Sequence, residues 1–474
     1  IWVGPPPEAI DAMGSKRAAR LAVTTVGVPV VPGYDGDAHS DADLIREAAR
    51  VGYPLMVKAA AGGGGKGMRL VYGADDLPAA LASARREALQ AFGSDELLLE
   101  RALHWPRHIE FQVFGDHHGG LIHLGERECS IQRRHQKIIE ESPSPAMTPD
   151  LRARMGAAAV AAARSVGYAS AGTVEFLLDA DCAFYFLEMN TRLQVEHPVT
   201  EAVTGLDLVE WQIRVAEGEL LPLTQDDVRF NGYAVEARVY AENPANDFLP
   251  VTGDVLLWRE PSGEGVRVDS GLNPRDRVTL HYDPMIAKVI AHGATRAYAH
   301  RRLLGALERT VLLGLTNNLA FLRDVIRHPA YAQGDLHTGF LTAHLADWTP
   351  PDGDAVPALI AASVAQFGGA PQVGTNPGYW RNNPNQPVRY RYLLRDDSLD
   401  VLLTPRDADR FAAQIDGTAH EYAVTLHART PEALTLTVDG LRQTLVYARS
   451  GDVWWVQVGA AVVTFETRPL LPVP

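Results

Sequence analysis

The chain has 474 residues, of which 46% are hydrophobic and 22% are charged, a mixture typical of a globular protein with about two to four domains. Its net charge of −14 argues against duplex nucleic acid as a partner, although a local basic site is compatible with it. Two cysteines, Cys129 and Cys182, are too few for a disulfide framework and favour an intracellular protein. No apolar run reaches the roughly twenty residues of a membrane helix, so we expect neither a membrane segment nor a signal peptide.

The first elements are predicted to be the end of a strand and two helices. Residues 1–4 are typical of a strand end, and residues 7–26 predict one helix with Lys16 near its middle. Residues 41–51 predict a second helix, which Ser40 or Asp41 caps.

A glycine-rich loop at 62–67 lies between two predicted strands, at 53–59 and 68–72. It formally matches a dinucleotide-binding fingerprint, but that fingerprint needs a helix after the glycines, and here a β-type run follows. A Walker A loop is excluded because Gly67 stands where Ser or Thr must follow the lysine. We therefore expect a flap that folds over nucleotide phosphates and donates backbone N–H groups to them; the alternative is a disordered glycine linker.

Beyond the flap, the sequence predicts a helix and three strands, at 78–92, 96–101, 108–114 and 120–125. The next block, residues 126–137, is strongly polar and rich in cationic side chains. From its residues alone, this block is either a solvated loop or part of a binding site. An alanine-rich helix is predicted after it, at 150–166.

The polar pattern at 184–197 is the strongest signal in the chain. A strand sends alternate side chains to opposite faces, so a strand here would place five polar groups on one face: Glu188, Asn190, Arg192, Gln194 and Glu196. An amphipathic strand that simply faces water is the alternative.

A second strand is predicted just upstream, at 173–178, with a turn signal at 179–182. A turn near Asp181 would place Glu175 opposite Glu188. Like charges directly opposite each other destabilise a hairpin, unless one pKa rises or a cation joins them. Because carboxylate oxygens commonly hold a phosphate-bound Mg²⁺, we hypothesise a metal–phosphate site on this hairpin.

The rest of the chain divides into a mixed part and an all-β part. Up to about residue 345, helices are predicted at 207–217, 297–311 and 317–326, and strands at 235–240, 255–258, 266–268 and 287–291. Residues 346–387 are rich in Pro, Gly and Asn and are expected to be a linker with a short helix at 356–367. Eight short strands then predict a separate barrel, at 388–394, 399–403, 410–415, 420–426, 433–438, 441–447, 453–458 and 461–466.

Three motifs in one order carry a family resemblance: the flap at 62–67, the block at 132–137 and the stretch from Glu188 to His197. Together they resemble the biotin carboxylase component of biotin-dependent carboxylases, which is an ATP-grasp enzyme. The resemblance covers residues 1 to about 345. It implies an α+β fold: an ATP-grasp fold with a biotin carboxylase C-terminal subdomain, followed by a separate all-β, barrel-like domain.

The implied division is a remnant of an N-terminal domain with an entry helix at 1–30, a flap subdomain at 31–103, the main ATP-grasp subdomain at 104–232, the C-terminal subdomain at 233–345, a linker with a short helix at 346–387, a barrel tethering domain at 388–468 and the start of a further linker at 469–474.

The resemblance also implies where the substrates and cofactors bind. ATP would be held by Lys16, Lys58, Gly63, Gly64, Gly65, Glu100, Leu103, His108, Gln132 and His135. Mg²⁺ or Mn²⁺ would be bound by Glu175, Glu188 and Asn190. Bicarbonate would be bound by Lys137, Arg192, Gln194 and Val195. Glu196 would be the general base, and Arg238 would stabilise the biotin enolate.

The implied reaction is the ATP-dependent carboxylation of biotin. Bicarbonate is a poor nucleophile, so its attack on the γ-phosphoryl group needs a positioned base and concentrated positive charge. The product, carboxyphosphate, would break to CO₂ and phosphate, and that phosphate would deprotonate biotin. A closed flap would exclude water from these steps.

The segments at 282–288, 314–322 and 337–341 look most like the α subunit of 3-methylcrotonyl-CoA carboxylase, with the propionyl-CoA and acetyl-CoA carboxylase α subunits as runners-up. The C-terminal β domain is similar to the domain with which such subunits dock the carboxyltransferase β subunit. The implied partners are a biotin carboxyl carrier domain and that β subunit, in an oligomeric complex of the bacterial cytoplasm or the mitochondrial matrix.

The family has an N-terminal domain of about a hundred residues before the position that matches Ile1, and a carrier domain with an Ala–Met–Lys–Met motif. We therefore expect the chain to be a fragment or to lack these parts. Two alternatives stay open: a different ATP-grasp ligase, such as a carbamoyl-phosphate or purine-synthesis enzyme, and a non-catalytic fragment that only binds its β partner.

Overall fold

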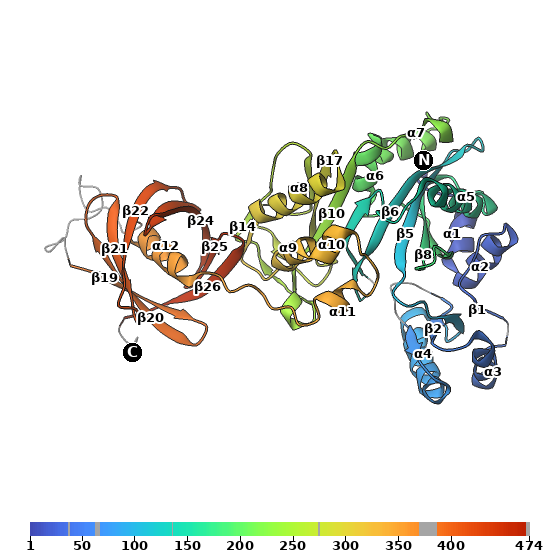
Figure 1. Ribbon diagram of the computed structural model, residues 1–474, viewed down its shortest axis with the longest axis horizontal. Coiled ribbons are helices and arrows are strands. Elements are labelled where there is room, and N and C mark those ends of the chain that lie inside the picture. The colour runs from blue at the N-terminus through green and yellow to red at the C-terminus, as the bar shows by residue number, and fades with distance from the viewer. Residues whose placement is uncertain (37, 62–66, 135, 274, 369–385, 471–474) are drawn as a thin grey trace.

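Figure 1 shows a computed structural model of the chain, which describes all residues except 37, 62–66, 135, 274, 369–385 and 471–474. The molecule is elongated. The subdomain with β2 and α4 lies at one end, an extended sheet runs through the middle, and a barrel lies at the other end (Figure 1). None of the helices in the described part of the chain is long and apolar enough to cross a membrane.

The predicted first helix is two helices, α1 (Pro7–Gly14) and α2 (Lys16–Thr25). The chain is extended at Ser15, whose hydroxyl accepts a hydrogen bond from the Ala18 N–H and so caps α2. Lys16 therefore lies at the start of a helix and not in the middle of one. Residues 1–4 belong to no strand, so that expectation was wrong as well.

The flap subdomain is a four-stranded sheet in the order β1-β4-β2-β3, packed against two helices. Its apolar core includes Leu44, Val57, Leu81 and Leu99. The elements are β1 (Gly33–Tyr34), α3 (Asp41–Val51), β2 (Leu55–Ala59), β3 (Arg69–Val71), the 3₁₀ turn η1 (Ala74–Asp76), α4 (Leu77–Phe92) and β4 (Leu97–Arg101). β2 and β3 pair antiparallel, as predicted, and most of the glycine-rich loop between them lies outside the described residues.

The main sheet has eight strands in the order β15-β17-β10-β7-β6-β5-β8-β9. Their bounds are β5 (Arg107–Gly115), β6 (Leu121–Arg133), β7 (Gln136–Ser142), β8 (Ser170–Leu178), β9 (Phe184–Asn190), β10 (Tyr233–Tyr240), β15 (Val266–Ser270) and β17 (Met285–Gly293). Because β10 pairs with both β7 and β17, one continuous sheet joins the parts predicted as the main and C-terminal subdomains.

Helices and short elements surround this sheet. α5 packs on β5, β6 and β8, α6 lies over β6, β7, β10 and β17, and α8 packs on β10 and β17. The bounds are α5 (Pro149–Ser165), α6 (His197–Thr204), α7 (Leu208–Ala216), η2 (Gln225–Asp227), β11 (Glu242–Asn243), η3 (Pro244–Asn246), β12 (Leu249–Pro250), β13 (Gly253–Asp254), β14 (Leu257–Arg259), β16 (Arg277–Val278), α8 (Arg296–Arg309), β18 (Val311–Leu313), α9 (Leu319–Arg327), α10 (Pro329–Gln333) and α11 (Phe340–His344).

The polar block after residue 125 is not a solvated loop. β6 continues through it to Arg133, and the side chains of Glu126, Arg127, Glu128 and Ser130 are buried. Buried charges persist only where they are paired, so this block has to be part of an ion-pair network.

The predicted strand over 184–197 is too long. β9 ends at Asn190, and α6 begins at His197 with Pro198 in its first turn and Glu196 as its N-cap residue. Proline is favoured in the first turn of a helix, because the N–H that it lacks has no partner there. The period-two face therefore stops at Asn190, and the chain brings Gln194 and Glu196 back to the sheet through a turn.

The C-terminal domain is a closed eight-stranded barrel, as predicted. Its strands are β19 (Val388–Leu394), β20 (Asp397–Pro405), β21 (Arg410–Ile415), β22 (Glu421–Arg429), β23 (Ala433–Val438), β24 (Leu441–Ser450), β25 (Val453–Val458) and β26 (Ala461–Arg468). Each strand pairs with its sequence neighbour, and β26 pairs with β19 to close the barrel.

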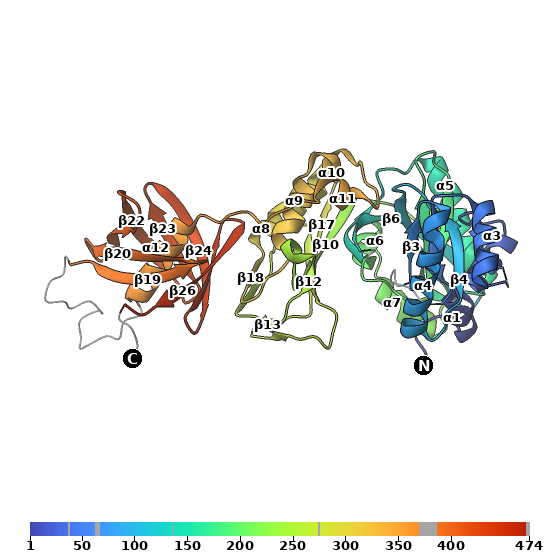
Figure 2. The same cartoon turned by 90° about the horizontal axis from the view of Figure 1, so that it is seen from below.

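The short helix that we assigned to the linker is the core of the barrel. α12 (Ala355–Gly368) lies among the barrel strands (Figure 2) and buries Leu359, Ile360 and Val364 against them. Ser363 and Gln366 hydrogen-bond to the buried hydroxyl of Tyr392 on β19. A helix that is apolar on all sides needs such an enclosure, since a linker helix would expose part of its apolar surface.

Ile360→Ala is expected to destabilise the barrel by about 2–5 kcal/mol, because it leaves a cavity where helix and strands meet. Hydrogen exchange of the barrel amides in mild denaturant measures this change. Leu441→Ala is the matched control, since Leu441 is 65% exposed, and it should change exchange little. Equal effects of the two variants would show that α12 does not hold the barrel together.

Candidate active site

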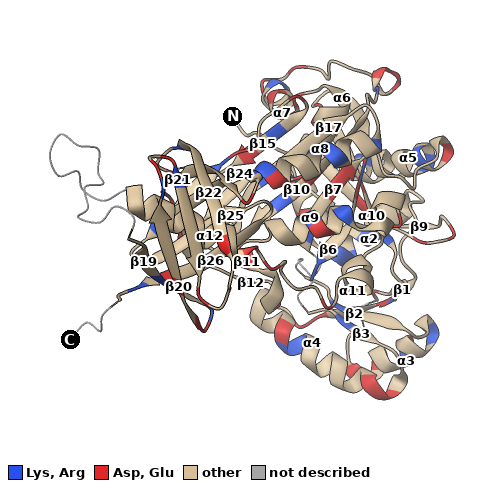
Figure 3. Cartoon of the chain, turned by 60° about the vertical axis from the view of Figure 1, so that its left-hand side comes forward, with Lys and Arg blue, Asp and Glu red and all other residues tan. Residues whose placement is uncertain are grey.

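One lysine joins three carboxylates at the centre of the main sheet. Lys137 lies on β7, and its Nζ donates to Glu110 on β5. The same Nζ donates to Glu175 Oε1 on β8 at 2.8 Å and to Glu196 Oε1 at 2.7 Å. All three carboxylates are 3% exposed or less. We call Lys137 with these three glutamates the lysine cluster. Acidic and basic positions lie close together around β6, β7 and β10 (Figure 3).

The charges of the lysine cluster follow from its geometry. Burial alone raises the pKa of Glu175, but Lys137 and His108 hold that pKa well below its ordinary value. Burial likewise opposes ionisation of Glu196, yet Lys137 and Arg238 lower its pKa. Burial lowers the pKa of Lys137, and the surrounding glutamates raise it well above its usual range. Glu175 and Glu196 are therefore anions around a permanent cation.

Arg238 connects Glu196 to a further carboxylate. It lies on β10, and its Nη2 donates to Glu196 Oε2 at 2.9 Å. On the other side, its Nε donates to Glu140 Oε1 at 2.6 Å. Glu196 is thus held between two cations, one on each oxygen, in a buried setting. The sequence-predicted residues Lys137, Glu196 and Arg238 lie in contact.

The acidic hairpin has the predicted register, with Glu175 on β8 directly opposite Glu188 on β9. Burial and the charge of Glu175 raise the pKa of Glu188, which is the predicted cost of placing two carboxylates together. Asn190 Nδ2 donates to Glu175 Oε1 at 2.8 Å, and Gln194 Nε2 donates to the same oxygen at 3.1 Å.

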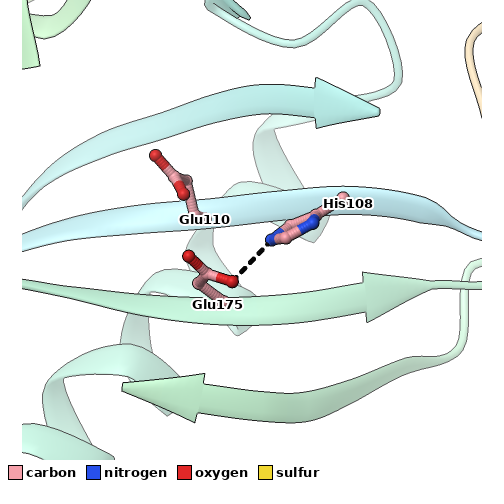
Figure 4. Close-up of side chains that lie close together, drawn as sticks. All are labelled: His108, Glu110 and Glu175. Atoms are coloured by element: carbon pink, nitrogen blue, oxygen red, sulfur yellow. Dashed lines mark ion pairs between the residues drawn. The ribbon is translucent and has the colours of Figure 1, made fainter. Parts of the chain in front are cut away.

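Several possible metal ligands, two carboxylates and a histidine, lie close together at this hairpin. Figure 4 shows His108 on β5 and Glu175 on β8 pointing toward each other, with His108 Nε2 2.8 Å from Glu175 Oε2, and Glu110 on β5 beside them. One ligand atom from each of the three lies within 4.8 Å of the others. The carboxylates of Glu175 and Glu188 are the hard oxygen donors that Mg²⁺ and Mn²⁺ prefer, so the residues fit such an ion.

The described residues predicted to bind nucleotide lie on α2, on the flap sheet and after its strand β4, and near the ends of β5 and β6 in the main sheet. Lys58 on β2 and Arg20 on α2 both donate to the carboxylate of Glu100 on β4. Gln132 Nε2 lies 2.6 Å from His108 Nδ1. Leu103 is half-buried in the segment that follows β4.

Lys16, at the start of α2, is near enough to the hairpin for Glu188 to affect it. Burial lowers the pKa of Lys16, and Glu188 partly opposes that change. The remaining predicted nucleotide ligands lie outside the described residues: Gly63, Gly64, Gly65 and His135.

Two predicted bicarbonate ligands stand apart from the lysine cluster. Arg192 is exposed, and its guanidinium donates to the backbone carbonyl of Leu193 at 3.3 Å. The backbone carbonyl of Val195 accepts a hydrogen bond from Lys288 Nζ on β17 at 2.7 Å. The structure therefore does not place Arg192 in contact with Glu196.

The sequence analysis did not single out Arg127, although this residue hydrogen-bonds to several side chains of the site. Arg127 on β6 is fully buried, and its guanidinium donates to Glu110, Gln112, Thr173, Thr200 and Gln194. The alternation of His108, Glu110 and Gln112 along β5 was the available signal, since it places three polar groups on one face of a strand otherwise rich in aromatic and aliphatic residues.

A flap subdomain built as a four-stranded sheet, next to a larger sheet that carries an acidic hairpin and a buried lysine, defines the chain as an ATP-grasp protein. Residues 15–224 match the family model "Carbamoyl-phosphate synthase L chain, ATP binding domain". Residues 236–343 match "Biotin carboxylase C-terminal domain", and residues 354–469 match "Methylcrotonyl-CoA carboxylase, alpha-subunit, BT domain".

Single relatives match this chain over most of its length. The chain is 49% identical over 369 residues to the mitochondrial alpha subunit of methylcrotonoyl-CoA carboxylase from Dictyostelium discoideum, covering 77% of this chain and 53% of the relative. It is 49% identical over 344 residues to the mitochondrial propionyl-CoA carboxylase alpha chain of Homo sapiens, covering 72% of this chain and 47% of the relative.

A solved structure agrees with the fold. The biotin carboxylase domain of Hydrogenobacter thermophilus 2-oxoglutarate carboxylase, crystallised with MgADP, ADP and bicarbonate, is 42% identical with a TM-score of 0.72. That match covers 73% of this chain and 77% of the other. The chain belongs to the biotin carboxylase family. It spans about half the length of the methylcrotonoyl-CoA carboxylase subunits it matches, 53% and 49% for two of them.

Lys137→Met is expected to lower the free energy of unfolding by about 3–5 kcal/mol at neutral pH, because three buried carboxylates lose their shared cation. Denaturant titration measures the change. The depressed pKa values of Glu175 and Glu196 stabilise the fold above their unfolded value of about 4.5, and this stabilisation is lost as the pH falls through the folded values.

The difference between wild type and Lys137→Met should therefore shrink on acidification. As a control, Arg214→Met removes a cation from exposed ion pairs with Glu210 and Glu219 and should cost under about 1 kcal/mol. A loss for Lys137→Met no larger than this control would contradict the account of the lysine cluster.

Proposed function

We propose that the chain is the biotin carboxylase part of an acyl-CoA carboxylase α subunit. It uses ATP and bicarbonate to carboxylate biotin on a carrier domain. The observation that carries the proposal is Glu196, a buried carboxylate at the start of α6 that is held between the cations of Lys137 and Arg238 beside an acidic hairpin. A base and two cations in one buried site suit the activation of a small anionic nucleophile.

We assign nucleotide binding to residues of the flap and of the main sheet. Lys16 and Lys58 are the cations for the phosphates, with the flap glycines Gly63, Gly64 and Gly65. Glu100 and Leu103 are assigned to the adenine, and His108, Gln132 and His135 to the ribose and phosphates. Glu175, Glu188 and Asn190 would hold Mg²⁺ or Mn²⁺, which supplies charge neutralisation on the phosphates.

The proposed first step is attack of a bicarbonate oxygen on the γ-phosphorus. The bond from that phosphorus to ADP breaks, ADP leaves, and the bicarbonate proton passes to Glu196. In the resting site, two cations make Glu196 a weak base. Bound anions compete for Lys137 and Arg238, so the pKa of Glu196 rises when the substrates are in place, and the base strengthens where it is needed.

The proposed second step uses carboxyphosphate. Its C–O bond breaks to give CO₂ and phosphate, the phosphate removes the proton from a ring nitrogen of biotin, and that nitrogen then forms a bond to the carbon of CO₂. Arg238 offers its guanidinium to the oxyanion that biotin carries after losing this proton. Arg192, Gln194 and Val195 are assigned to bicarbonate, and because Arg192 is exposed, we propose that it turns toward the site when bicarbonate binds.

Among acyl-CoA carboxylases, we propose 3-methylcrotonyl-CoA as the substrate of the whole enzyme. The match of residues 354–469 to the methylcrotonyl-CoA carboxylase BT domain supports this choice. The barrel is assigned to docking of the carboxyltransferase β subunit, within an oligomer of the bacterial cytoplasm or the mitochondrial matrix. The domain limits given from the sequence remain part of this proposal, except that the helix at 355–368 is assigned to the barrel domain.

Glu196→Gln is expected to abolish bicarbonate-dependent ATP cleavage and to leave nucleotide binding nearly unchanged, because the amide keeps the shape of the side chain but cannot accept a proton. Steady-state ADP release and calorimetric nucleotide binding measure the two properties. Glu201→Gln, on the next turn of α6, is the control and should retain turnover. Equal loss of binding and turnover in Glu196→Gln would show a structural role.

Arg238→Ala is expected to spare bicarbonate-dependent ATP cleavage more than biotin carboxylation, since the proposed role of Arg238 begins after carboxyphosphate has formed. The two rates are measured with and without free biotin on the protein as its gene encodes it. A common fall of both rates would contradict the enolate role, and an absence of any biotin stimulation in the wild type would favour another ATP-grasp ligase.

A further inference from the structure

Two glutamates that have no role in the proposed reaction lie behind Arg238. Glu140 on β7 and Glu236 on β10 are directly paired across neighbouring strands. Both side chains are 0% exposed. Cross-strand partners have their Cβ atoms about 4.5–5.5 Å apart, so the two carboxyl groups are within reach of each other.

Three of the four oxygens of this carboxyl pair have no hydrogen-bond partner among the described residues. Glu140 Oε1 accepts from Arg238, while Glu140 Oε2 and both oxygens of Glu236 are unpartnered. A buried ionised carboxylate without a donor is costly, and two of them side by side are costlier still. One proton on the pair removes the repulsion and supplies the missing donor.

The charged groups facing Glu236 do not replace that proton. They are Glu140 on β7, Arg238 on β10, Lys288 on β17 and Glu196 at the start of α6. Lys288 carries a suitable charge, but its Nζ donates to the Val195 carbonyl and lies 3.1 Å from Asp269. Arg238 is shared between the other two glutamates.

Titration of the pair follows the same physics. Burial raises the pKa of Glu140 to about 7, against the pull of Arg238. Burial and the neighbouring Glu140 raise the pKa of Glu236 well above its ordinary value. At neutral pH the pair therefore keeps at least one proton.

We infer that Glu236 keeps a proton in the folded protein and hydrogen-bonds Glu140, so that the two together form a singly charged anchor that positions Arg238. The inference deepens the proposed function and rests on it only for the role of Arg238. When Glu196 takes the bicarbonate proton, its ion pair with Arg238 weakens. The anchor then holds the guanidinium in place while Nη2 becomes available to the biotin oxyanion.

Protonation of Glu236 can be tested by a measurement that does not need enzymatic activity. Infrared spectroscopy at neutral pH should show the carbonyl stretching band of a buried protonated carboxylic acid in the wild type, and the difference spectrum against Glu236→Gln should show its loss. An unchanged band in Glu236→Gln would overturn the inference. This measurement stands even if the protein proves inactive, so it separates the inference from the proposed function.

The pH dependence of stability gives a second readout. A carboxyl with a raised pKa keeps its proton in the folded state where the unfolded chain has released it. Its contribution to the unfolding free energy therefore falls as the pH rises from about 4.5 toward 7 and above. Glu236→Gln should lose part of this fall, and a curve parallel to that of the wild type would contradict a titrating pair.

The positioning role is tested by comparing variants. Glu140→Gln should lower biotin-dependent kcat/KM on the order of tenfold or more while sparing bicarbonate-dependent ATP cleavage. Glu236→Ala should show the same split, and Glu236→Gln should restore most of the loss, since its amide can donate to Glu140 as the acid does.

Glu141→Gln is the matched control, because Glu141 is the next buried glutamate of β7 but pairs with Arg296 and His300. This variant should change stability, but it should not lower biotin-dependent turnover more than bicarbonate-dependent ATP cleavage. The positioning role would be overturned if the biotin-dependent kcat/KM of Glu236→Gln were no higher than that of Glu236→Ala. It would also be overturned if Glu141→Gln lowered this kcat/KM while sparing bicarbonate-dependent ATP cleavage.

Discussion

The site depends on one buried ammonium that serves three carboxylates. Lys137 brings together Glu110, Glu175 and Glu196 from two strands and the start of a helix. The register of the main sheet fixes the two strands, and α6 packs on that sheet. Without the cation, the three charges could not be buried so close together. The lysine cluster is therefore a condition for folding of this region, and in the proposed reaction Lys137 also offers its charge to anionic substrates.

The same arrangement links the two halves of the proposed reaction. Glu196 has Lys137 on one oxygen and Arg238 on the other. Protonation of Glu196 therefore weakens its ion pair with Arg238, the residue that we assign to biotin. Glu140 and Glu236 stand behind Arg238 and are assigned no contact with the substrates. In the proposed reaction the ion pairs of these side chains change as charge moves, while the continuous sheet holds their backbone in place.

The sequence predicted those features that depend on local patterns. The opposition of Glu175 and Glu188 followed from a turn signal and a period of two, and the barrel strands followed from alternation and regular turns. It did not predict where β9 ends, because Pro198 reads equally well as a strand terminator. Nor did it place the helix at 355–368 inside the barrel, since enclosure depends on contacts with strands distant in sequence. Arg127 was missed for the same reason: its partners come from four separate segments.

The central claim is that an oxygen of bicarbonate attacks the γ-phosphorus of ATP in this site. Bicarbonate labelled with heavy oxygen tests it most directly, with the released phosphate analysed by mass spectrometry. Since the attacking oxygen stays on phosphorus when carboxyphosphate breaks down, the account predicts one labelled oxygen in the phosphate for each ATP cleaved. Phosphate that acquires its new oxygen from water alone would contradict it.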